Sequence, residues 1–279
     1  MQTGRPSQTA LGAAGLRAAH QVLEHGRIFH DPLALRILGL TAHDITRDTE
    51  THQARSRLRL FIAIRSRIAE DALAAALARG VRQLVVLGAG LDTYAYRSSL
   101  GDQLRIFEVD HPATQAWKRQ RLADAAIPLP ANLSFVAVDF ERDVLGERLA
   151  AAGFDPSQRS FFSWLGVVPY LSERATFATL GAVATLPGGT DVVFDYTNPT
   201  ADISDADGRA AREALAARVA SLGETLQSSF DSVDLRERLT ALGFRTIDDH
   251  GPAQIAAQFF PGRATASPRA GAHVMHART

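Results

Sequence analysis

The stretch Gln83-Leu84-Val85-Val86-Leu87-Gly88-Ala89-Gly90-Leu91-Asp92 decides the fold of this chain. Its first half, residues 83–87, is almost wholly apolar, which is typical of a parallel strand buried on both faces. The strand runs directly into Gly88 and Gly90, whose missing Cβ atoms allow the backbone to approach a ligand closely. The stretch therefore predicts a strand, a tight turn and a ligand at the carboxyl end of the strand.

Strands and helices alternate after this stretch. Helical patterns occupy residues 112–126, 141–152, 172–186 and 232–242. This order predicts an α/β fold with a mostly parallel sheet and helices on both faces. The apolar runs that predict the other strands lie at 104–109, 133–138, 160–164, 190–194, 244–247 and 272–275.

The flanking segments are expected to be mainly helical. Apolar residues at helical spacing predict a helix near residues 11–23, and Asp31-Pro32 resembles the start of a second helix that ends at Leu38. Residues 41–51 are expected to form a loop, 52–79 one or two helices, 199–229 a polar helical insertion and 261–268 a polar loop.

These segments predict one domain over residues 1–279. The parts we expect are an N-terminal helical cap (1–80), a cofactor-binding core (81–198), a lid insertion (199–230) and the C-terminal part of the sheet (231–279). A lid is expected because the polar insertion between buried strands is too long for an ordinary loop.

The composition limits the possible functions. The chain has 279 residues with 30 basic and 30 acidic side chains, so no overall field favours nucleic acid or a membrane surface. Because it contains no cysteine, thiolate catalysis, disulfides and Cys-based metal sites are excluded. The histidines at 20, 30, 111 and 250 lack metal-ligand spacing, and we expect no metal site.

No segment suggests export or membrane insertion. Arg17 and His20 interrupt the apolar pattern near the start, so we expect no signal peptide, and a transit peptide is a minor alternative. No window reaches the ~20 consecutive apolar residues of a membrane span. We expect a soluble, cytoplasmic protein and leave its oligomeric state open.

Asp110 sharpens the prediction of a ligand site. It follows Gly90 by twenty residues and ends the second predicted strand, where a carboxylate can accept hydrogen bonds from both hydroxyls of an adenosine ribose. A nicotinamide dinucleotide would also fit, but its G-x-G-x-x-G motif needs a small third residue, and position 93 is threonine. This favours S-adenosyl-L-methionine over NAD.

Several segments resemble the bacterial branch of the leucine carboxyl methyltransferase-like family, and the similarity spans most of the chain. The run from Phe107 through Gln115 to Arg119 is far more specific than a glycine motif alone. The matching segments are Arg17-Ala18-Ala19-His20, Asp31-Pro32-Leu33-Ala34, Arg65-Ser66-Arg67, 87–93, 107–112, Gly166-Val167-Val168-Pro169-Tyr170-Leu171 and Asp195-Tyr196.

The resemblance implies a Rossmann-like class I methyltransferase fold, with seven strands of which the last is antiparallel, and S-adenosyl-L-methionine as cofactor. Arg65 and Arg67 would pair with the methionine carboxylate, for which a guanidinium fork is well shaped. Asp139 and the backbone of Phe140 would meet the adenine edge. The other expected cofactor contacts are Gly88, Ala89, Gly90, Asp92, Glu108, Asp110, His111 and Leu165.

Two positions depart from the family pattern. Many relatives have glutamate where this chain has Leu165, and many have arginine where it has Tyr94. A carboxylate at position 165 would have met the amino group of the cofactor. Backbone carbonyls near Leu165 can take its place.

The predicted function is in-line transfer of a methyl group to an oxygen of a small molecule, such as a polyketide-type secondary metabolite. The candidate catalytic side chains are Tyr170, Tyr196 and His111, and none is an unambiguous base. This favours a carboxylate or acidic hydroxyl acceptor, because such a group is already ionised. The alternatives are a non-catalytic S-adenosylmethionine-binding protein of the same fold and a nicotinamide-dependent oxidoreductase.

Overall fold

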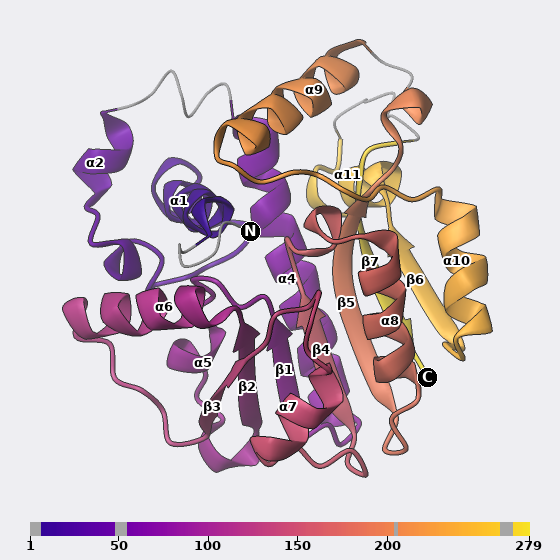
Figure 1. The fold of residues 1–279 in the computed structure, drawn as a ribbon. Coiled ribbons are helices and arrows are strands. Elements are labelled where there is room, and N and C mark those ends of the chain that lie inside the picture. Colours follow the sequence, from indigo (N-terminus) through magenta and orange to yellow (C-terminus); the bar gives the residue numbers. More distant parts are fainter. Residues whose placement is uncertain (1–6, 48–54, 204–205, 263–269) are drawn as a thin grey trace.

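The computed structural model describes residues 7–47, 55–203, 206–262 and 270–279. Within these residues a seven-stranded sheet has the strand order β3-β2-β1-β4-β5-β7-β6 (Figure 1). β1 to β5 are parallel, whereas β7 runs antiparallel to both β5 and β6. The strands are β1 (Gln83–Leu87), β2 (Arg105–Asp110), β3 (Leu133–Ala137), β4 (Ser160–Trp164), β5 (Thr190–Thr197), β6 (Thr246–His250) and β7 (Ala272–Arg278).

Helices cover both faces of this sheet (Figure 1). Alternate residues of β1 explain why: Val85 and Leu87 pack toward α7, α8 and α10, while Leu84 and Val86 pack toward α4, α5 and α11. A strand that buries side chains on both faces must be apolar throughout, as 83–87 nearly is. These helices are α4 (Ser56–Ala78), α5 (Tyr94–Arg97), α7 (Leu145–Ala151), α8 (Glu173–Ala184), α10 (Ser232–Ala241) and α11 (Pro252–Phe259).

The N-terminal segment forms a cap over the carboxyl ends of the first strands. A third apolar cluster joins Ala18, Ile37 and Ile45 of the cap to Leu91 after β1 and to Leu122. α9 lies above β5 beside this cap (Figure 1). The elements concerned are α1 (Gln8–Leu23), η1 (Arg36–Leu38), α2 (Ala42–Thr46), α6 (Pro112–Asp124) and α9 (Ala206–Ser221).

The predicted alternation and the predicted bounds of β1 and β4 are confirmed. Two predictions in the cap are wrong. Residues after Asp31 form turns and the short η1 instead of an α-helix, because their backbone hydrogen bonds mostly span three residues and Gly39, with a φ of +65°, ends the segment early. The Asp31 carboxylate does accept the Leu33 N–H at 2.9 Å, as the predicted cap would. The predicted loop at 41–51 contains α2, which begins with a capping box between Thr41 and Asp44. Residues 48–54 lie outside the described part of the chain.

Further predictions were wrong at element ends. α7 begins at Leu145 instead of 141, because Asp139 first opens a turn whose carbonyl accepts from Arg142 and Asp143. β5 continues to Thr197, because β7 pairs with it that far. α11 was missed, although Pro252 at its first position is a start signal. β7 also continues three residues past its predicted end, to Arg278, and β6 spans Thr246–His250 instead of 244–247. Most of the predicted loop at 261–268 lies outside the described residues.

Candidate active site

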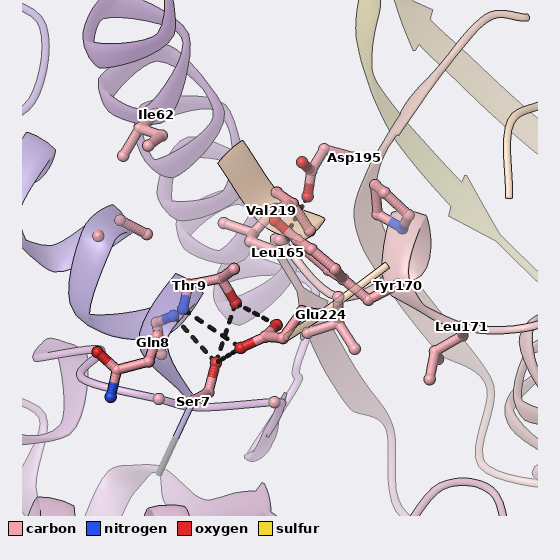
Figure 2. A pocket seen from close by; sticks show the side chains of 18 of the residues that line it. Ser7, Gln8, Thr9, Ile62, Leu165, Tyr170, Leu171, Asp195, Val219 and Glu224 are labelled. Carbon is pink, nitrogen blue, oxygen red and sulfur yellow. Dashed lines mark hydrogen bonds between the residues drawn. The ribbon is translucent and has the colours of Figure 1, made fainter. Parts of the chain in front are cut away.

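One cavity of about 650 Å³ lies at the carboxyl ends of β1, β2, β4 and β5. Ligands of open α/β sheets bind at this edge, and the volume falls within the ~300–1,000 Å³ usual for small-molecule sites. α1 and α9 lie above this edge of the sheet (Figure 1). α1, α4 and α9 all contribute residues to the lining of the cavity. Figure 2 shows side chains from these elements pointing into it, among them Thr9, Ile62 and Val219.

The turn after β1 forms the floor. Gly88 and Gly90 have φ values of +64° and +46°, which side-chain-bearing residues rarely adopt. A Cβ at Gly88 would lie 2.2 Å from Val167 Cγ2, so close packing of the two loops also requires glycine there. Ala89 and Asp92 line the cavity beside them.

Asp110 ends β2 directly beside this turn. Its Oδ2 accepts the Gly90 N–H at 2.6 Å and its Oδ1 accepts the His111 N–H at 2.7 Å. The side chain is buried, and this burial raises the pKa of Asp110, while the two backbone N–H donors act in the opposite direction. Each carboxylate oxygen keeps a lone pair for a second donor from the cavity.

A second charged group lies across the cavity on α4. Arg65 Nη1 donates to Asp195 Oδ2 at 2.8 Å, and Asp195 Oδ1 accepts the Gly166 N–H at 2.5 Å. Gly166 has a φ of +73°, and a Cβ there would lie 2.7 Å from Arg65 Nη2. The loop after β4 therefore needs glycine so that the guanidinium can reach the cavity.

Most of the predicted cofactor residues line this cavity. Those that do are Arg65, Gly88, Ala89, Gly90, Asp92, Asp110, His111, Asp139, Phe140 and Leu165.

Arg67 and Tyr196 lie elsewhere, which corrects their predicted placement. Arg67 is half exposed and pairs with Asp71 at 2.8 Å, because a residue two positions after Arg65 on a helix faces another direction. Tyr196 points away from the cavity, because successive strand residues alternate faces. Its hydroxyl hydrogen bonds to Ser232 and Asp249, each at 2.9 Å.

Glu108 is also absent from the cavity lining. Its carboxylate is buried under α6, where it pairs with Lys118 Nζ at 2.7 Å and accepts the Tyr96 hydroxyl at 3.1 Å. Glu108 therefore belongs to the packing of α6 against β2, and the motif in which it lies gave no signal of this.

The remaining catalytic candidates line the cavity. His111 is the N-cap of α6, and its Nδ1 accepts the Ala113 N–H at 3.3 Å. That bond places the ring proton on Nε2, so the free nitrogen is a donor and not a base. Burial raises the pKa of Tyr170, so its hydroxyl stays protonated at neutral pH.

The cap is attached to the glycine turn by Arg17. Its Nη2 donates to the Leu91 carbonyl at 2.5 Å, and its Nε lies 2.8 Å from Asp31 Oδ2. The Thr93 hydroxyl donates to the same carboxylate at 2.7 Å. Thr93 is therefore part of the contact between cap and turn, which no local pattern could predict.

Sequence reasoning also missed a contact between the cap and the insertion. Glu224, which follows α9, accepts the Thr9 hydroxyl at 2.7 Å and the Ser7 hydroxyl at 3.2 Å (Figure 2). The Thr9 N–H also approaches this carboxylate, at 3.4 Å. These residues lie more than 200 positions apart and carry no motif, so only the folded chain reveals the contact.

The described residues contain no group of three or more His, Cys, Asp or Glu side chains placed to hold a metal ion. Within the same ranges, no helix has both the length and the apolar character needed to cross a membrane.

Comparison with known proteins places the chain in a family. Residues 10–184 match the leucine carboxyl methyltransferase family. A Bacillus subtilis protein with the provisional name S-adenosyl-L-methionine-dependent methyltransferase YktD is 34% identical over 202 residues, 71% of this chain and 66% of the relative. A Mycobacterium avium protein with a similar provisional name is 34% identical over 213 residues, 74% of this chain and 67% of the relative.

The alignments span about two thirds or less of the length of such relatives. Among solved structures, an O-methyltransferase family protein from Burkholderia thailandensis has a TM-score of 0.48 at 13% identity, covering 95% of this chain and 71% of that one. The family match over residues 10–184 identifies the cofactor as S-adenosyl-L-methionine and not a nicotinamide dinucleotide. The chain belongs to the leucine carboxyl methyltransferase family of S-adenosyl-L-methionine-dependent methyltransferases.

Proposed function

We propose that this protein transfers a methyl group from S-adenosyl-L-methionine to an oxygen of a small molecule. The observation that carries the proposal is one cavity that joins the buried carboxylate of Asp110 to the guanidinium of Arg65. A carboxylate suits the ribose hydroxyls of the cofactor, and a guanidinium suits its carboxylate. The residues present therefore fit the cofactor at both ends.

Each part of the cofactor has a partner of matching chemistry in this proposal. Asp110 accepts from the ribose, and Gly88 and Gly90 pass beneath it without side chains. Arg65 uses donors that remain beside its bond to Asp195. Asp139 and the backbone of Phe140 meet the adenine, and backbone carbonyls near Leu165 receive the amino group. The bound cofactor supplies an electrophilic methyl group on a sulfonium.

The acceptor in this proposal carries a carboxylate or an acidic hydroxyl. Among the described cavity residues, the candidates leave no free general base, because His111 Nδ1 accepts a backbone N–H and Tyr170 is protonated. An acceptor that is already ionised needs no base. The task left to the protein is to align the acceptor oxygen and exclude water.

α9 and the start of α1 form a lid in this proposal. Both line the cavity, and Glu224 joins them through Ser7 and Thr9. Replacing residues 200–228 with a short Gly/Ser linker should leave affinity for S-adenosylhomocysteine nearly intact and abolish turnover, because the strands hold the cofactor. Full activity of the truncated protein would contradict the lid.

The proposal is tested by incubating the protein with methyl-labelled S-adenosylmethionine and a panel of carboxylic acids, phenols and alcohols. Label should appear in carboxylic acids as methyl esters, which alkali hydrolyses, or in acidic phenols as methyl ethers, which alkali does not cleave. Calorimetry should show binding of S-adenosylhomocysteine and none of NADH. Cofactor binding without transfer to any acceptor would favour a non-catalytic binding protein of the same fold.

A further inference from the structure

Arg212 is a cation in the cavity whose charge nothing described in the structure neutralises. It lies on α9, lines the cavity and is partly buried. Within the described ranges, no hydrogen-bond or ion-pair partner reaches its guanidinium. Burial lowers the pKa of Arg212, which expresses the cost of holding this charge away from water.

Two other arginines of the cavity wall differ from Arg212, because each has a carboxylate partner. Arg17 pairs with Asp31 and Arg65 pairs with Asp195, each at 2.8 Å. Glu224, a carboxylate that lines the cavity just after α9, is occupied by the hydroxyls of Ser7 and Thr9. Arg212 therefore has no carboxylate of its own, although a half-buried charge is favourable only when paired.

Several apolar side chains line the cavity close to Arg212 in the chain. Leu215 and Val219 of α9 and Leu222 just after it follow Arg212 at spacings of three, seven and ten residues. α9 also places Arg218 in the lining, but at an exposed position, whereas Arg212 is partly buried. Across the cavity, α4 contributes Phe61 and Ile62. Tyr170 lines the same cavity.

From this geometry we infer that Arg212 binds a carboxylate of the methyl acceptor, and that the rest of the acceptor is apolar. The inference rests on the proposed function and deepens it, because it assigns the specificity-determining residue and the acceptor class. A planar guanidinium binds a carboxylate through two parallel hydrogen bonds. Because Arg212 is carried by α9, an acidic acceptor also holds the lid against the cavity.

The test measures binding of acids without turnover. Calorimetry in saturating S-adenosylhomocysteine compares 2-naphthoate and octanoate with the corresponding amides. The acids should bind the unaltered protein and the amides should not. Arg212→Gln should weaken acid binding about 10- to 100-fold, and Arg212→Lys should weaken it less.

The matched control is Arg209→Gln, which removes the same charge from the same helix outside the cavity lining. Arg209→Gln should leave the affinity for acids unchanged. In all variants the affinity for S-adenosylhomocysteine should stay within about twofold, because the proposed cofactor site lies on the turn after β1 and not on α9. Equal binding of acids and amides, acid binding that survives Arg212→Gln, or no acid binding at all would overturn the inference. Acid binding that depends on Arg212 without any methyl transfer would overturn the proposed function alone.

Discussion

Arg65 on α4 and Asp195 on β5 form an ion pair of 2.8 Å, although 130 residues separate them in the chain. Both side chains are largely buried at the cavity wall. The same carboxylate accepts the Gly166 N–H, so Asp195 orients the guanidinium and the loop after β4 together. A cofactor carboxylate would therefore meet a guanidinium that is already held in place.

Arg65→Lys should weaken binding of S-adenosylhomocysteine about tenfold, because a point charge cannot reproduce a guanidinium fork that pairs with two partners at once. Calorimetry measures the dissociation constant. Arg67→Lys is the matched control, because Arg67 is half exposed and pairs with Asp71 outside the cavity. If Arg67→Lys lost affinity for S-adenosylhomocysteine and Arg65→Lys did not, Arg67 and not Arg65 would bind the cofactor carboxylate.

Asp110→Ala should weaken binding of S-adenosylhomocysteine by about 1.5 to 3 kcal/mol, or about 10- to 150-fold, because it removes a charged acceptor. It should also lower the melting temperature, since the Gly90 and His111 N–H groups lose their partner. Asp124→Ala, at an exposed position on α6, should change neither quantity. An unchanged dissociation constant for Asp110→Ala would show that Asp110 does not bind the cofactor.

Glu108→Gln should lower the free energy of unfolding by about 3 to 5 kcal/mol, because it leaves the buried ammonium of Lys118 without a counter-charge. Urea denaturation measures this loss. The fraction that remains folded should bind S-adenosylhomocysteine as the unaltered protein does. If Glu108→Gln bound S-adenosylhomocysteine more weakly at unchanged stability, Glu108 would be part of the cofactor site after all.

Glu224→Ala should loosen the contact between α1 and α9, because the Ser7 and Thr9 hydroxyls lose their shared acceptor. Amide hydrogen exchange should become faster in both helices, with little change in cofactor affinity. Glu213→Ala, an exposed position of α9 outside the cavity lining, provides the comparison. Equal exchange in the two variants would show that Glu224 does not hold the lid.

His20 should make stability depend on pH. Its Nε2 accepts the Phe29 N–H at 3.3 Å and its Nδ1 lies 3.0 Å from Glu24, so the folded chain holds the neutral ring. Burial lowers the pKa of His20 from its ordinary value of 6.5, despite the opposing effect of Glu24. The unfolded chain therefore binds a proton that the folded chain does not.

It follows that stability is lost as the pH falls through the ordinary pKa toward the folded one. The free energy of unfolding should decrease from about pH 7.5 to about pH 5.5, and it should decrease less in His20→Gln, which cannot titrate. Urea denaturation at both pH values measures the difference. Equal pH dependence of the two proteins would assign the effect to other groups.

The sequence by itself determined the sheet and the floor of the cavity. The run 83–87 must be buried on both faces, and Gly88 and Gly90 must follow it in a turn, because these are local demands of apolar side chains and backbone angles. Asp110 followed from the same logic, since the ends of parallel strands meet at one edge. These positions needed no knowledge of distant contacts.

Only the tertiary structure decided what surrounds that floor. Spacing along a helix could not separate Arg65 from Arg67, because the choice depends on where α4 packs and on Asp195. Tyr196 points to the face of β5 opposite the cavity, and Glu108 is buried under α6, where it pairs with Lys118. No sequence motif indicates either contact. The bond from Thr9 to Glu224 and the unpaired charge of Arg212 both depend on how distant segments of the chain fold around one cavity. Long-range packing of this kind leaves no local pattern in the sequence.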